Sequence, residues 1–149
     1  MKFTLPLLAL LLLAGCASVP LTDTAKDHEA KQFTPEAGKA NIYINRDWFA
    51  TALTLQIVLD GRIVGKLSPH TYQCLSVPAG YHVLAIGGET QNSAQSKFNA
   101  ASGNNYFFNA GYSVGWVAER VHLDMVDEQT GRAELKDSKR AEALDYETN

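Results

Sequence analysis

The sequence predicts a mainly β protein: a small antiparallel β-sandwich of about seven to eight strands with a short C-terminal helix. Two observations lead to this fold class. Short apolar runs of alternating polarity recur along the chain, and turn residues such as Asp-Gly and Pro-Ala-Gly separate them in the stretch 53–88. No long helical pattern lies between these runs. With 149 residues, the chain has room for one ordinary domain and a short processing segment.

The N-terminus has the pattern of a lipoprotein signal peptide over residues 1–15. A positive start precedes an apolar run over 3–13, which is too short to cross a bilayer as a helix, since a crossing takes about 20 residues. The run ends in Leu-Ala-Gly-Cys, which looks like the bacterial lipobox. We expect the Cys16 thiol to carry diacylglycerol, and cleavage between Gly15 and Cys16 to free an amine for a third acyl chain. An ordinary secretory signal with a chance cysteine is the alternative, but run length, small residues and cysteine position all agree.

Several acyl chains, palmitate among them, make membrane attachment effectively permanent. Ala17 follows the cysteine instead of Asp, which in lipoproteins of Gram-negative envelopes implies sorting to the outer membrane. We expect the domain to face the periplasm. Residues 16–39 are polar and carry two prolines, so they are expected to be a flexible tether of roughly 25–30 Å, with at most a short helix over 24–32. The folded domain is expected over 40–149.

The strand pattern begins with a short run at 41–45. Residues 53–59 alternate between aliphatic and mostly polar side chains, as in a strand with one buried face. Asp60-Gly61 supplies the positive φ angles of a tight hairpin turn, and 62–67 returns from it.

A second hairpin of the same design is expected downstream. Its strands would be 71–77 and 81–86, joined by a turn at Pro78-Ala79-Gly80. Residues 91–105 are rich in Ser, Asn, Ala and Gly, and they are expected to form a loop with one short edge segment.

The last third of the chain completes the sheets. Residues 106–118 are aromatic and predict one bulged strand or two short ones. Residues 119–126 alternate cleanly, with Val121, Leu123 and Met125 expected inward. Beyond them, 128–144 has helical character, which predicts the C-terminal helix.

Composition and motifs exclude several functions. A net charge of −3 without a Lys/Arg cluster argues against nucleic acid and anionic lipid headgroups as partners. No catalytic motif and no cofactor motif is present. The four histidines have no metal-ligand spacing, so they are interpreted as ordinary strand and loop residues. Cys74 is interpreted as a small buried hydrophobe. An alternative places a ligand, metal or catalytic site across strands, with His82, His122 and Asp124 as its residues.

Trp48-Phe49 are the candidate partner-contact residues. They follow Arg46 and Asp47 in a segment between strands, where large apolar side chains are unusual unless they have a role. They either fold over an open end of the sandwich as core caps or are displayed to a partner.

Several fragments, in a fixed order, are similar to a family of uncharacterised proteobacterial envelope proteins, many of them lipoproteins, known as domain of unknown function 2846. The fragments are F-x-P-x-x-G-K-A-x-I-Y-I-x-R at 33–46, V-x-D-G-x-x-x-G at 58–65, T-Y at 71–72, V-P-x-G-x-H at 77–82 and E-x-x-G-x-x-x-L at 128–135. The central fragments also resemble PEGA-type β-sandwich modules. Gln73-Cys74 departs from the family, which tends to place aromatic residues there. The resemblance implies the fold and no activity.

The sequence therefore predicts a lipid-anchored envelope protein that is not an enzyme, a binding or structural accessory of the outer membrane. Its expected partners are the membrane, through the N-terminal acyl chains, and an envelope protein or glycan. No cofactor is expected. The alternative is a small-ligand, metal-binding or enzymatic β-domain.

Overall fold

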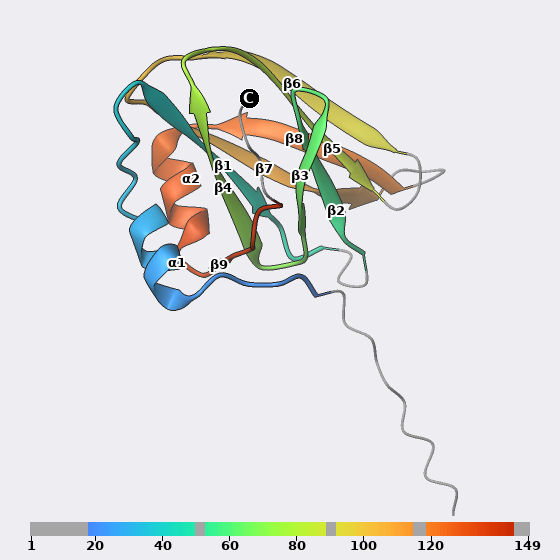
Figure 1. The fold of residues 1–149 in the computed structure, drawn as a ribbon. Helices are drawn as coiled ribbons and strands as arrows, with labels where there is room; N and C mark the ends of the chain where they lie inside the picture. The colour runs from blue at the N-terminus through green and yellow to red at the C-terminus, as the bar shows by residue number, and fades with distance from the viewer. Residues whose placement is uncertain (1–17, 50–52, 89–91, 115–118, 145–149) are drawn as a thin grey trace, which may run out of the picture.

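Two β-sheets pack face to face in the computed structural model, which describes residues 18–49, 53–88, 92–114 and 119–144 (Figure 1). The five-stranded sheet has the order β8 (Glu119–Val126), β7 (Asn105–Val114), β1 (Lys39–Arg46), β4 (Thr71–Pro78) and β9 (Lys139–Arg140). The four-stranded sheet has the order β3 (Arg62–Leu67), β2 (Leu55–Leu59), β5 (Gly80–Gly88) and β6 (Ser93–Ala100). The predicted small β-sandwich is confirmed. Within these ranges no helix has the length and apolar character needed to cross a membrane.

The first predicted hairpin is confirmed. β2 and β3 pair antiparallel, with Leu59 opposite Arg62. Asp60 and Gly61 have φ angles of 50° and 81°, which are the left-handed values that a two-residue hairpin turn requires.

The second predicted hairpin is wrong. β4 pairs with β1 and β9, whereas β5 pairs with β2 and β6 in the other sheet. The segment Pro78–Gly80 is therefore a corner where the chain crosses between sheets, and Gly80 adopts a φ of 141° there. Turn residues can reverse a strand or turn a corner, and only the distant partner strands decide between these outcomes.

Three other expectations need correction. The loop expected over 91–105 contains the complete strand β6, whose polar residues face solvent while Phe98 is buried. Met125 is 49% exposed, because β8 is the outermost strand of its sheet. Helix α2 (Glu128–Leu135) ends earlier than the helical composition, and the chain then forms β9 beside β4. The pairs β1–β7 and β4–β9 are parallel, so the sandwich is not wholly antiparallel.

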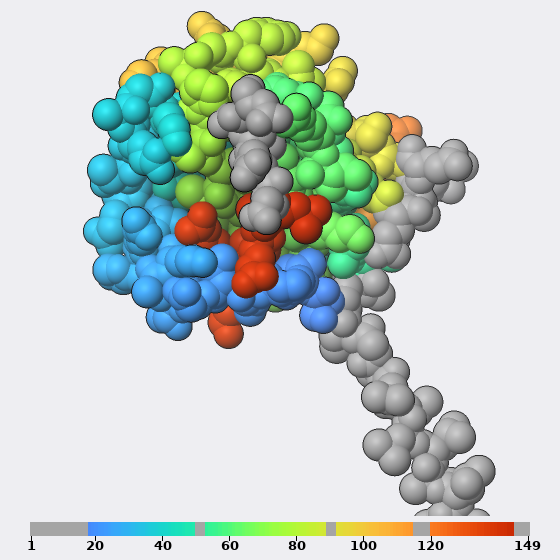
Figure 2. All heavy atoms as spheres, viewed as in Figure 1, coloured from blue at the N-terminus to red at the C-terminus, as the bar shows by residue number. Residues whose placement is uncertain are grey.

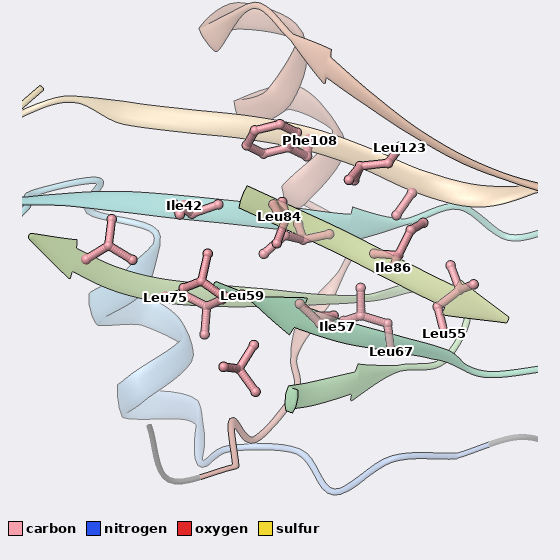
Figure 3. Packing of buried hydrophobic residues seen from close by; sticks show 14 of the residues in the cluster. Ile42, Leu55, Ile57, Leu59, Leu67, Leu75, Leu84, Ile86, Phe108 and Leu123 are labelled. Atoms are coloured by element: carbon pink, nitrogen blue, oxygen red, sulfur yellow. The ribbon is translucent and has the colours of Figure 1, made fainter. Parts of the chain in front are cut away.

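The main core lies between the two sheets (Figure 3). Ile42 and Phe108 project from the five-stranded sheet, and Ile57 and Leu84 project from the four-stranded sheet; all four are nearly or completely buried. Burying such side chains contributes about 1.5–3 kcal/mol each, which makes this layer the main source of stability.

A second, aromatic core covers the outer face of the five-stranded sheet. Tyr43 stacks on Phe107 with ring centroids 5.1 Å apart, and Tyr72 lies beside them. Helix α2 packs closely here because Gly131 carries no side chain; a Cβ at this position would lie 2.4 Å from Phe107. Asp127 caps the helix by accepting a hydrogen bond from the N–H of Thr130.

Helix α1 (Thr24–Ala30) lies within the short helix expected over 24–32, but it packs on this face with Phe33, so the flexible tether predicted over 16–39 is wrong for residues 21–33. The carboxylate of Asp27 accepts hydrogen bonds from the Tyr72 hydroxyl at 2.8 Å and the Arg140 N–H at 3.0 Å. Lys31 adds an ion pair to Asp27 at 3.0 Å. These distant partners fix a polar segment whose own residues gave no sign of docking.

Candidate partner-binding surface

The segment after β1 carries the predicted contact residues, and the structure divides their roles. Phe49 is half-buried and packs against the main core, so it is a core cap. Trp48 is 67% exposed and meets the Phe49 ring edge-on, with centroids 6.2 Å apart. The sequence left two roles open for these residues. Phe49 caps the end of the core, and Trp48 is displayed at the surface, where a partner can contact it.

A buried guanidinium holds this turn in shape. The Arg46 side chain is fully buried at the end of β1, and its Nη1 donates to Oδ1 of Asp47 at 2.5 Å. Its Nη2 donates to the carbonyl oxygen of Phe49 at 2.8 Å, and the guanidinium lies over the Tyr112 ring at 5.0 Å. Burial lowers the pKa of Arg46, while the Asp47 carboxylate opposes that effect and favours the charged form.

Asp47 completes the network. Its Oδ1 also accepts a hydrogen bond from the N–H of Phe49 at 3.1 Å. The carboxylate lies directly over Gly111 of β7, where a Cβ would approach Oδ2 to 1.9 Å. Nε2 of His122 lies 3.5 Å from the same Oδ2. The backbone around Trp48 is therefore preorganised, so its indole can be presented at little entropic cost on binding.

The structure does not bring together the residues of the alternative site. His82 lies on the inner face of β5, beside Phe98. His122 and Asp124 lie on the outer face of β8, in the other sheet. In the part of the chain that the structure describes, no three His, Cys, Asp or Glu side chains form a group able to hold a metal ion.

His82 has a structural role that the sequence did not suggest. Its Nδ1 lies 2.7 Å from Oδ2 of Asp60, and its Nε2 lies 2.9 Å from the carbonyl oxygen of Pro78. Oδ1 of Asp60 accepts the N–H of Val83 at 2.9 Å. The imidazole thus joins the β2–β3 turn to the corner between sheets. The spacing of Asp60 and His82 carried no local signal of this contact.

Cys74 faces the aromatic core. Burial raises the pKa of the Cys74 thiol, and the nearby Arg140 and Tyr43 only partly offset this effect. His70, the residue before β4, is exposed. A thiol with this pKa is a poor nucleophile, as expected for a structural residue.

Comparison of the sequence with known proteins identifies a relative whose activity is uncharacterised. No family model matches the sequence. The chain is similar to an uncharacterised protein of Haemophilus influenzae, with 32% identity over 124 residues, which cover 82% of this chain and 73% of the relative. Similarity of this extent shows common descent along most of both chains. The chain belongs to the family of this uncharacterised Haemophilus influenzae protein.

Proposed function

We propose that the protein is a lipid-anchored accessory of the outer membrane, with a non-enzymatic β-sandwich domain that binds an envelope partner through Trp48. The observation that carries the partner site is the exposed indole of Trp48 beside a fully buried Arg46. Tryptophan is enriched among residues that dominate binding energy at interfaces, and a rigid support increases its value there. The lipobox ending at Cys16 supports the membrane location.

Anchoring is tested by Cys16→Ala. The wild-type protein is expected in the membrane fraction, and the variant is expected in the soluble fraction, because it lacks the acylated thiol. Retention of the Cys16→Ala protein in the membrane would refute lipid anchoring at this residue.

Partner binding is tested by a photo-cross-linking amino acid at position 48 in intact cells. Tyr81, 64% exposed, provides the matched control at the other end of β5. Gly88, at the opposite end of β5, lies against Tyr112, whose ring supports Arg46 and the Trp48 turn. Tyr81 is seven residues from Gly88, which is about 23 Å along an extended strand. Discrete adducts are expected at position 48 only, and equal labelling at both positions would refute the site. A glycan partner is tested by cosedimentation of the protein with purified sacculi. Trp48→Ala should reduce the fraction of protein that sediments.

A further inference from the structure

The two ends of the described chain lie side by side across one edge of the sandwich (Figure 2). Leu21 and Ala141 form an antiparallel bridge. The N–H of Ala141 donates to β4 and the N–H of Leu144 donates to β3, each at 2.8 Å, so this edge is joined to both sheets. Residues 18–22 and 139–144 together are called the terminal seam.

The terminal seam lies very close to the predicted lipid anchor. Val19 packs against the main core, and it is only three residues after Cys16. A chain spans at most about 3.6 Å per residue, so Val19 is within about 11 Å of the acylated residue in any conformation. The headgroup region of one leaflet is itself about 5–7 Å thick. A domain attached at Cys16 therefore cannot stand away from the bilayer.

The exposed side chains of the terminal seam suit a lipid surface. Leu21 is 43% exposed and Leu144 is 54% exposed. A cavity of about 470 Å³ opens beside them, with aliphatic walls that include Val19. Lys66 and Glu142 are its charged lining residues, and their charges balance. The terminal seam also includes Lys139, which is exposed, and Arg140, so its apolar part is the cavity together with the Leu21 and Leu144 side chains.

We propose that the terminal seam is the membrane-facing surface of the domain, with Leu21 and Leu144 in contact with the phospholipid headgroup region. This inference rests on the proposed acylation of Cys16, and it adds an orientation that acylation alone does not give. The end of the sandwich that carries Tyr81 then points away from the bilayer.

The test uses the full-length lipoprotein reconstituted in phosphatidylcholine vesicles that contain doxyl-labelled lipid. A bimane label is placed at Leu144→Cys or, as control, at Tyr81→Cys, each with Cys74→Ala. Quenching at position 144 is expected to exceed that at position 81 by about threefold or more, because only lipid contact brings the quencher close. It should persist at about 1 M salt, where charges are screened beyond about 3 Å.

The outcomes separate the two proposals. Flotation of the protein with the vesicles, together with equal quenching at both positions, would leave anchoring intact and overturn the orientation. Failure to float would overturn anchoring and the orientation with it. Protection of position 144 in native envelopes but not in pure lipid vesicles would assign the terminal seam to a protein partner, against the proposal. A bimane label at Leu21→Cys tests the same surface at a second position, where strong quenching is also expected.

Discussion

Removing the charge of Asp47 should cost far more stability than its partly exposed position suggests. Asp47→Asn keeps an oxygen that can accept from Arg46 and Phe49, but it leaves the guanidinium without its carboxylate. Breaking a buried ion pair costs about 3–5 kcal/mol. The Asp47 side chain is 25% exposed and the amide still accepts, so we expect a loss of about 2–3 kcal/mol in the free energy of unfolding.

The matched variant is Arg46→Met, which fills similar core space without a charge. It should cost only about 1–2 kcal/mol, because water can solvate the Asp47 carboxylate that remains. Adding Asp47→Asn to Arg46→Met should then cost little more, for a coupling energy of about 2 kcal/mol. Urea unfolding followed by circular dichroism measures all four proteins. Additive losses would show that the two residues stabilise the turn independently and would refute the buried pair as its support.

Three further predictions concern the core and its outer face. Gln73→Met should raise the free energy of unfolding by about 1–3 kcal/mol, because neither amide atom of the buried Gln73 has a hydrogen-bond partner among the described residues. A melting temperature below that of the wild type would contradict this prediction. Burial raises the pKa of Asp27, but the hydrogen bond from Tyr72 and the charge of Lys31 outweigh it and leave the pKa below its ordinary value. The stability from Asp27 is therefore complete above about pH 4 and declines as the pH falls through the folded-state pKa, so Asp27→Asn should flatten the acid limb of a pH–stability curve. Because burial raises the pKa of Cys74, its thiol should react with a disulfide reagent at pH 7 at least about tenfold more slowly in the folded than in the urea-unfolded protein.

Local patterns predicted the strands better than their pairing. The alternation over 53–59 and the Asp60-Gly61 turn predicted the β2–β3 hairpin, because residues close in sequence form the ladder between its two strands. Pro78–Gly80 has equally strong turn residues, yet the strand after it joins the other sheet. The pairing of β4 is decided by β1, which lies about 30 residues upstream and pairs with β4 in the five-stranded sheet.

The docking of residues 18–39 shows the same limit on the N-terminal side. Polar composition predicted a tether, but Asp27 is bound by groups 45 and 113 residues away in the chain. The available signal was Tyr43 on the face of 41–45 opposite Ile42 and Ile44, since a large aromatic residue on the outer face of a sheet needs a cover, and the structure buries it. Single-sequence periodicity does not identify a cover as polar as α1.

The partner site and the terminal seam are structurally connected, which restricts what Trp48 can bind. Thr54 lines the cavity beside the terminal seam, and its carbonyl oxygen accepts from the hydroxyl of Tyr112 at 3.0 Å. The Tyr112 ring in turn supports Arg46, which shapes the turn of Trp48. If the terminal seam faces the bilayer, Trp48 lies at the membrane-proximal end of the domain. Its partner must then reach the bilayer surface. When proteolysis releases the protein anchored through Cys16, we therefore expect the adducts formed at position 48 to remain in the membrane fraction with the partner.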